Sequence, residues 1–206
     1  MNKPILNQLM MRSGESKHHI RGIKAVDRIL RTFDQDPEIA NGYCGVLADC
    51  FDMTDEGLSL AVSSVAGKRL FYHVVTTKHV VNRILRRKKE MLDHGERDLE
   101  GEMTFIPLDT IQRNFLRPEV VEILRKSKDG KPFIKLLRPH RPEYQPALDW
   151  IFGKHVLVRD TAAFKPVQQS VQHAQVWQLT TFFLFGEESL SLLSAFKLEI
   201  GFRQCG

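Results

Sequence analysis

This chain of 206 residues has few cysteines, no long hydrophobic run and no secretory signal. Cys44, Cys50 and Cys205 are its three cysteines. They form an odd set without a paired motif, which favours a reducing compartment. No apolar run approaches the roughly 20 residues that span a bilayer, and the first residues carry charge without a continuous apolar segment. We therefore expect no contact with a membrane.

The nucleotide-binding and hydrolytic motifs with a known mechanism are also missing. Three Gly-Lys pairs occur, at Gly67, Gly130 and Gly153, but each lacks the upstream glycine and the hydroxyl residue after lysine that a phosphate-binding loop needs. The chain contains neither Gly-x-Ser-x-Gly nor His-Glu-x-x-His. These absences disfavour an ATPase, a hydrolase or a zinc peptidase, so we expect a protein without catalysis or cofactor.

A metal site is not expected either. Cys44 and Cys50 flank a short apolar segment, where cysteines usually serve as small core residues. His73 lies in an apolar strand beside Tyr72 and is interpreted as a hydrogen-bonded structural histidine. The pair His18-His19 is near a chain end, where histidines are usually solvated.

The formal charge of +5 and the pI near 9.2 permit weak, salt-dependent contact with nucleic acid without requiring it. The basic stretch from Arg83 to Lys89 wraps around a predicted helix, so its charges cannot all face one phosphate backbone. A loop over residues 126–142 can gather its charges on one side. The candidate DNA contacts there and just before it are Arg125, Lys126, Lys128, Lys131, Lys135, Arg138 and Arg141.

Hydrophobic periodicity predicts a mixed α+β fold. In the first half, helices are expected over residues 23–33, 54–66 and 77–92, and strands over 42–47, 70–75 and 103–108. Asp36-Pro37 should end the first helix, Gly67 should cap the second, and Thr76 or Thr77 should begin the third. A strand, a helix and a strand within about 40 residues form a βαβ unit with parallel strands.

The second half is predicted in less detail. Pro118 should begin a helix, another helix should end at residues 150–153, and Val156-Leu157-Val158 should form a strand. Pro166 should delay or bend a helix over residues 161–173. The apolar segments 180–185 and 190–196 have no clean period and are not assigned.

The segment Leu70-Phe71-Tyr72-His73-Val74-Val75 is apolar on both alternating faces, and two interpretations stay open. It can be a central parallel strand that is buried on both sides. Alternatively, it can lie near a sheet edge, with one large side chain in its own core and another offered to a partner.

Four segments together resemble one protein family. They are Gly42-Tyr43-Cys44-Gly45-Val46, the run from Ala66 to Val75, the run Gly101-Glu102-Met103-Thr104-Phe105-Ile106-Pro107-Leu108, and the run from Phe152 to Arg159. They resemble the hinge domain of structural maintenance of chromosomes (SMC) proteins, and most closely the hinge of the third such subunit of cohesin. The resemblance covers roughly residues 20–175.

The resemblance implies a hinge-type domain with βαβ units and mixed sheets flanked by helices, over residues 21–175. Residues 1–20 would be a linker or the end of a coiled-coil arm. The function implied is non-catalytic dimerisation with the hinge of the first SMC subunit of cohesin, which closes a DNA-embracing ring in the nucleus, on the chromosome. Leu70, Phe71 and Tyr72 would face that partner.

The chain departs from the family pattern after about Val176, so residues 176–206 are interpreted as a divergent tail. One of the two expected dimer contacts then lacks its usual sequence. Two other functions stay open: a small α/β enzyme or nucleotide-binding protein built on the βαβ unit, and a free-standing nucleic-acid-binding domain.

Overall fold

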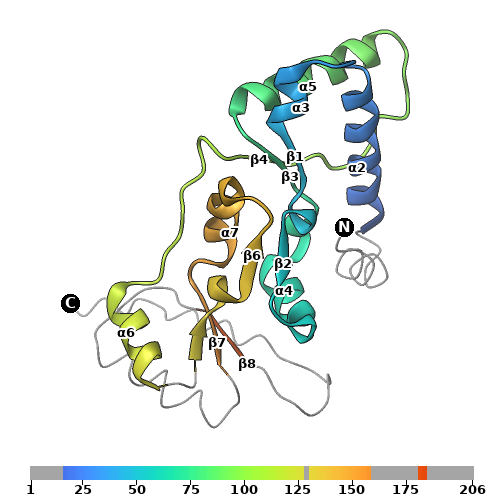
Figure 1. Ribbon diagram of the computed structural model, residues 1–206. Helices are drawn as coiled ribbons and strands as arrows, with labels where there is room; N and C mark the ends of the chain where they lie inside the picture. The colour runs from blue at the N-terminus through green and yellow to red at the C-terminus, as the bar shows by residue number, and fades with distance from the viewer. Residues whose placement is uncertain (1–15, 128–129, 159–180, 185–206) are drawn as a thin grey trace, which may run out of the picture. The chain divides into compact units, whose positions relative to one another are not determined.

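The computed structural model describes residues 16–127, 130–158 and 181–184, which form two compact units (Figure 1). Unit 1 contains the described residues up to 112 together with 138–148. Unit 2 contains residues 113–137 and the described residues from 149 onward. Each unit has a three-stranded sheet of its own, and each is described separately below.

Unit 1 alternates short helices and strands. Its elements are α2 (Ser16–Arg31), α3 (Pro37–Gly42), β1 (Tyr43–Val46), the 3-10 turn η1 (Leu47–Asp49), β2 (Phe51–Met53), η2 (Glu56–Leu58), α4 (Ser59–Ala66), η3 (Gly67–Phe71), β3 (His73–Val75), α5 (Lys78–Asp93) and β4 (Phe105–Pro107). Later in the chain, β6 (Leu137–Pro139) pairs with β2, and the turn η5 (Pro142–Tyr144) follows it.

The main sheet of unit 1 has the strand order β1-β3-β4. Strand β1 is antiparallel to β3, while β4 is parallel to β3, with His73 opposite Phe105. Helix α5 connects the two parallel strands, as the βαβ prediction required. The predicted mixed α+β fold class is confirmed.

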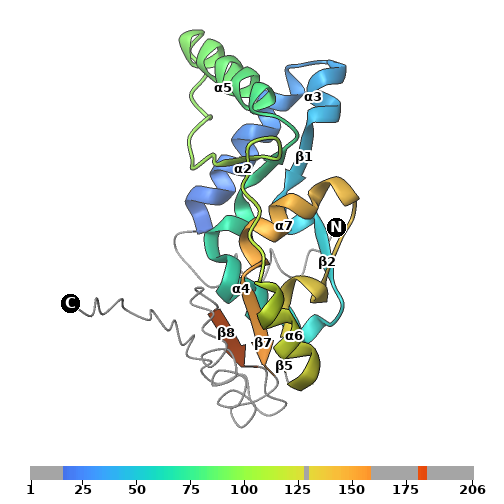
Figure 2. The same cartoon turned by 90° about the vertical axis from the view of Figure 1, so that its left-hand side faces the viewer.

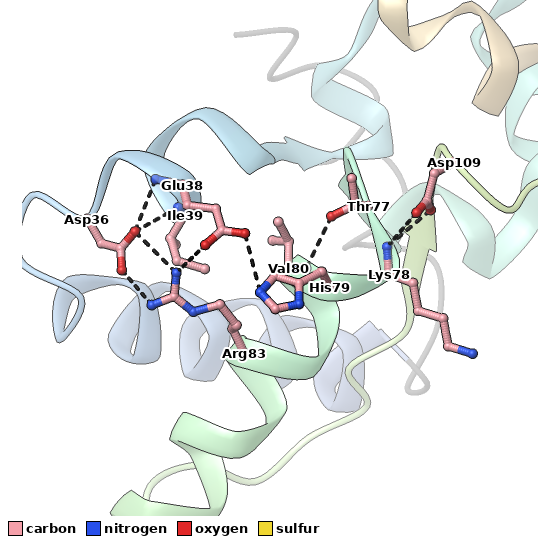
Figure 3. A network of polar contacts seen from close by, with 9 residues as sticks. All are labelled: Asp36, Glu38, Ile39, Thr77, Lys78, His79, Val80, Arg83 and Asp109. Atoms are coloured by element: carbon pink, nitrogen blue, oxygen red, sulfur yellow. Dashed lines mark hydrogen bonds and ion pairs between the residues drawn. The ribbon is translucent and has the colours of Figure 1, made fainter.

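Helix α5 begins where the sequence provides a cap. The Thr77 side chain accepts a hydrogen bond from the Val80 N–H, and the Asp109 carboxylate accepts one from the Lys78 N–H at 3.0 Å (Figure 3). Its apolar face, which includes Ile84 and Met91, is buried in a core formed with α2, α3 and the segment after α5. The buried members of that core are Ala25, Ile29, Ile39, Val75, Val80, Ile84, Met91 and Leu99.

A network of ion pairs joins α5 to the start of α3 (Figure 3). Arg83 contacts Asp36 at 2.6 Å and Glu38 at 2.7 Å, and His79 contacts Glu38 at 3.3 Å. The hydrogen bond from the Arg83 guanidinium lowers the pKa of the Asp36 carboxyl. Asp36 also accepts hydrogen bonds from the backbone N–H groups of Glu38 and Ile39, so one carboxylate caps α3 and holds α5.

Unit 2 is built from α6 (Pro118–Ser127), β5 (Gly130–Pro132), the turn η4 (Phe133–Leu136), β7 (His155–Val158) and β8 (Thr181–Leu184). Helix α7 (Gln145–Phe152) leads into β7. The strand order is β5-β7-β8, and α6 packs against β5 (Figure 2). Phe133 and Phe152 are both fully buried, and their rings stack with centroids 5.5 Å apart.

Two sequence predictions, one about a helix end and one about a loop, were wrong in detail. The first helix ends at Arg31, before Asp36-Pro37, because Asp36 and Pro37 begin the new helix α3. Helix α2 starts at Ser16, inside the segment 1–20, and the interpretation of that segment as a linker or the end of a coiled-coil arm stays a prediction. The expected loop over residues 126–142 contains β5, η4 and β6.

Two apolar segments differ from their predictions. The strand expected over residues 70–75 is a strand only at His73–Val75, because Gly67–Phe71 forms the 3-10 turn η3. The unassigned segment 180–185 contains β8, which pairs in parallel with β7. The helix predicted over residues 161–173 and the apolar segment 190–196 lie outside the described residues.

Candidate protein-binding interface

The three residues predicted to face a partner lie where η3 passes into β3. Leu70 is fully buried, Phe71 is 7% exposed, and the Tyr72 side chain is half-buried. The Tyr72 N–H donates to the Arg69 carbonyl, and the Tyr72 carbonyl accepts from the Leu47 N–H at 2.8 Å. Because the backbone of Tyr72 is fully used, only its side chain is available to a second protein.

Phe71 packs against helix α2. Its ring stacks on the buried His19 ring of α2, with centroids 5.2 Å apart and the planes almost parallel. His19 Nδ1 lies 3.6 Å from the carboxylate of Glu102, which follows the loop after α5. Leu70 and Phe71 therefore build the core of unit 1, and Tyr72 is the member of the predicted set that reaches the surface.

Strand β3 is the central strand of its sheet, and His73, Val74 and Val75 are all buried. For His73–Val75, the structure agrees with the first of the two interpretations given above, a central strand that is buried on both sides. The strands that lie at the edges are β1 and β4, and β4 is the one that continues the parallel pairing. An edge strand, and not β3 itself, is the part of this sheet that a second chain can extend.

The register of β4 with β3 determines which backbone groups of β4 point away from the sheet. The His73 N–H donates to the Thr104 carbonyl, and the Leu108 N–H donates to the Val75 carbonyl. In a parallel ladder the next residue along points its groups to the other side, so the N–H and C=O of Phe105 face away from β3. Pro107 also faces outward but has no N–H. Phe105 is therefore the residue of β4 whose backbone N–H can donate a hydrogen bond at this edge.

Behind the edge, His73 and Tyr43 share a hydrogen bond of 2.8 Å between His73 Nδ1 and the tyrosine hydroxyl. Phe105 contacts the other side of the imidazole, with ring centroids 5.3 Å apart. Burial lowers the pKa of His73 to about 4 and raises the pKa of the Tyr43 hydroxyl. At neutral pH, His73 is therefore an uncharged core residue that supports β4, as the sequence interpretation expected.

Three of the predicted DNA contacts are already engaged with acids. Arg125 and Lys126 both contact Glu122 on their own helix, at 2.9 Å and 3.4 Å. Arg141 contacts Glu143 at 3.4 Å. Such exposed pairs contribute little to stability, but they reduce the positive charge that these residues offer to a phosphate.

The other candidates are distributed over several elements, since the segment is not a single loop. Lys131 in β5 and Lys135 in η4 are exposed in unit 2, and Arg138 in β6 is exposed in unit 1. Lys128 lies outside the described residues. The DNA-contact assignment stays a prediction, now centred on Lys131 and Lys135.

The described residues contain no cluster of three metal-ligating side chains. Cys50 is fully buried, and its thiol donates to the Val46 carbonyl at 3.3 Å. Burial raises the pKa of this thiol to about 12, which makes it a core group and a poor nucleophile. None of the described helices combines the length and the apolar character that crossing a bilayer requires.

One feature escaped the sequence prediction: the two units repeat one topology. In each sheet a central strand pairs antiparallel with an earlier strand and parallel with a later one, β1-β3-β4 in unit 1 and β5-β7-β8 in unit 2. A sequence signal exists, because each central strand begins with His-Val, at His73 and His155, and a helix followed directly by Gly-Lys precedes each of them. The turn η3 separates these elements in unit 1 and obscures the repeat.

Comparison with known proteins finds relatives among the SMC proteins. SMC protein 3 of Caenorhabditis elegans is 32% identical over 96 residues, which is 44% of this chain and 7% of that protein. SMC protein 2 of Homo sapiens is 30% identical over 71% of this chain and 12% of its own length. The chain thus spans about a tenth of the length of these relatives.

Solved structures show the same fold. An asymmetric dimer of the Geobacillus stearothermophilus SMC hinge domain matches with a TM-score of 0.55 and 13% identity, over 89% of this chain and 70% of that one. A structure described as the folded elbow of cohesin matches with a TM-score of 0.60 and 20% identity, over 88% of this chain and 23% of the other.

The family model of the flexible hinge domain of SMC proteins matches residues 40–163, which is more than half of the chain. It spans β1, β3 and β4 of the first sheet and β5 and β7 of the second. Together with the repeated topology, this match shows that the protein belongs to the hinge-domain family of SMC proteins.

Proposed function

We propose that this chain is the non-catalytic dimerisation hinge of a cohesin-type chromosome-organising subunit. It pairs with the hinge of the first SMC subunit of cohesin and so helps to close a ring around DNA in the nucleus, where sister chromatids are held together. The observation that carries this proposal is the family match over residues 40–163, in a fold shared with a hinge solved as a dimer.

The geometry of unit 1 supports β4 as the pairing edge. Phe105 offers a backbone donor and acceptor to a second strand, while the side chain of Tyr72, the residue just before the His73–Phe105 pair, offers an aromatic anchor. Tyrosine is one of the residue types that dominate binding energy at protein interfaces. Of the predicted set, Leu70 and Phe71 would act indirectly, by fixing the position of Tyr72.

The cohesin assignment rests on two supports. The C. elegans relative carries the name of the third SMC protein, and the segment from Leu70 to Val75 resembles that subunit. The human relative is the second SMC protein, so the partner must be tested directly. Weak DNA contact through Lys131 and Lys135 is part of the same proposal, and Lys131→Glu/Lys135→Glu should reduce duplex binding and its dependence on salt.

Sedimentation velocity tests the proposal. The whole chain is mixed with the hinge of the first cohesin SMC subunit or, for comparison, with the hinge of the other SMC subunit in the complex of the second SMC protein. We expect a 1:1 complex with the first hinge alone, which Tyr72→Arg weakens at least tenfold by placing a charge in the contact. Phe115→Arg is the matched control, because Phe115 is 58% exposed in unit 2.

Two results would refute different parts of this proposal. Sedimentation as a monomer with every hinge tested refutes dimerisation. Equal or tighter pairing with the hinge of the second SMC protein's complex refutes the cohesin assignment and leaves the hinge function intact. Circular dichroism of each variant confirms that folding is retained.

A further inference from the structure

One side of α5, next to its buried face, carries an apolar stripe that the fold of unit 1 covers only in part. Leu85 is 43% exposed and Leu92 is 46% exposed, and Val81, which is partly buried against the core of unit 1, continues the stripe toward the start of the helix. These positions recur at intervals of four and seven residues, so they lie along one side of the helix, with the leucines about 10 Å apart. Leu85 and Leu92 are two of the three large hydrophobic residues that are exposed within the described residues.

The side of α5 next to the stripe, about 100° around the helix from the leucines, is firmly held, which fixes the direction of the stripe. Ile84 and Met91 are buried in the core, and Arg83 is bound by Asp36 and Glu38 of the α3 region (Figure 3). The stripe cannot turn inward without breaking these contacts. The two leucines therefore remain nearly half exposed, and covering them with a partner would contribute favourably to binding.

An open hollow of about 530 Å³ lies at the end of the stripe. Leu92 belongs to both features, and Leu99 forms the apolar floor of the hollow. This volume is in the range that accommodates a bulky side chain with room to spare. The other lining residues are Lys88, Gly95, Glu96, Arg97 and Glu100, of which Glu96 is paired with Arg28 at 2.8 Å.

The charge of helix α5 itself is positive, whereas the hollow at its end is lined by Glu96 and Glu100 as well as Lys88 and Arg97. Helix α5 carries six lysine and arginine residues against two acids. Its three arginines are engaged by acids, whereas no ion pair is recorded within the described residues for Lys78, Lys88 or Lys89. At 100° per residue, Lys88 lies on one flank of the leucines and Lys78 and Lys89 lie on the other. Figure 3 shows the Lys78 side chain pointing away from Asp109.

We propose that this face of α5 binds an acidic amphipathic helix of another protein. The leucines would contact the apolar side of that helix, one of its large side chains would enter the hollow, and its Asp and Glu residues would face the flanking lysines. A second copy of this chain does not fit, because its α5 would bring the same positive charge against the same lysines. This surface is separate from the β4 edge and does not depend on hinge pairing.

Fluorescence anisotropy with a synthetic probe tests the proposal. The probe is a labelled 21-residue peptide with leucine in an a/d heptad pattern and glutamate at the flanking positions, and its control has lysine in place of every glutamate. Titration uses the whole chain at ~150 mM salt. We expect saturable binding of the glutamate peptide with a micromolar Kd and no measurable binding of the lysine peptide.

The variants separate the apolar contribution from the charged one. Leu85→Ala/Leu92→Ala should weaken binding roughly thirtyfold, and Lys88→Glu/Lys89→Glu should weaken it about fivefold while improving binding of the lysine peptide. Phe115→Ala, which truncates the third exposed apolar side chain, should leave the Kd unchanged. The leucines are nearly half exposed, so circular dichroism should show an unchanged fold.

The proposal is overturned if the glutamate peptide does not bind, if both peptides bind equally, or if the leucine variant binds as well as the wild type. Duplex DNA of 20 base pairs and phosphatidylserine vesicles are titrated in parallel. Tighter binding of either, lost in the same leucine variant, would assign this face to a polyanion or a membrane and would also overturn it.

Discussion

The buried, hydrogen-bonded pair Tyr43–His73 leads to a quantitative prediction of how the stability of the chain depends on pH. Burial lowers the pKa of His73 from 6.5 to about 4 in the folded chain. Because the folded pKa is depressed, the stability due to neutral His73 is fully present above pH 6.5 and is lost as the pH falls toward 4. At 1.36 kcal/mol per pKa unit, a shift of this size corresponds to about 3 kcal/mol of unfolding free energy lost between pH 7 and pH 4.

A double variant isolates this effect. Tyr43→Phe/His73→Phe removes the titrating ring and both hydrogen-bonding partners, so at pH 7 it should be within about 1 kcal/mol of the wild type. Tyr43→Phe alone leaves His73 Nδ1 buried without its partner and should cost about 1 to 3 kcal/mol. The other histidines and carboxylates titrate in both proteins, so their contributions cancel in the comparison.

The assay is urea unfolding followed by circular dichroism at pH 7, 5.5 and 4. The double variant should lose about 3 kcal/mol less than the wild type over this range. If both proteins lose the same stability between pH 7 and pH 4, then His73 is not held neutral by burial, and our account of the core behind β4 is wrong.

Three further substitutions test how the units are packed. Gly22→Ala raises the helix propensity of α2, but the new Cβ would collide with the backbone carbonyl of Glu102. We therefore expect the free energy of unfolding in urea to fall by about 1 to 3 kcal/mol. A more stable variant would mean that α2 does not pass close to the loop at Glu102. Thr77→Ala removes the cap of α5 and should cost about 1 kcal/mol, with Thr76→Ala as its neutral neighbour control. Phe133→Ala should cost about 3 to 5 kcal/mol in unit 2, and a cost below 1 kcal/mol would contradict the buried stack.

Much of the fold was predictable because its signals are local. Thr77 caps α5, Pro118 begins α6, and the strand–helix–strand spacing gives the parallel pair β3–β4. Other sequence signals were compatible with two different local structures. Pro37 was interpreted as the end of one helix but begins another, since a proline fits the first turn of a helix as well as it ends the one before.

The candidate interface shows where a sequence pattern is insufficient. Leu70, Phe71 and Tyr72 read as a strand, because periodicity cannot show that the 3-10 turn η3 places the first two side chains in the core. The pairing edge depends on strand order, which places β4 and not β3 at the border of the sheet. Burial of Phe71 depends on its contact with His19, about 50 residues earlier in the chain.

Hydrogen exchange at the Phe105 amide, measured with and without the hinge of the first cohesin SMC subunit, tests the central claim most directly. The free N–H at the edge of β4 should exchange rapidly in the isolated chain and at least a hundredfold more slowly in the complex, because a partner strand would take it as a donor. The His73 amide, already bonded to Thr104 within the sheet, serves as the internal reference. A complex that forms while the Phe105 amide still exchanges at its free rate would contradict pairing through this edge.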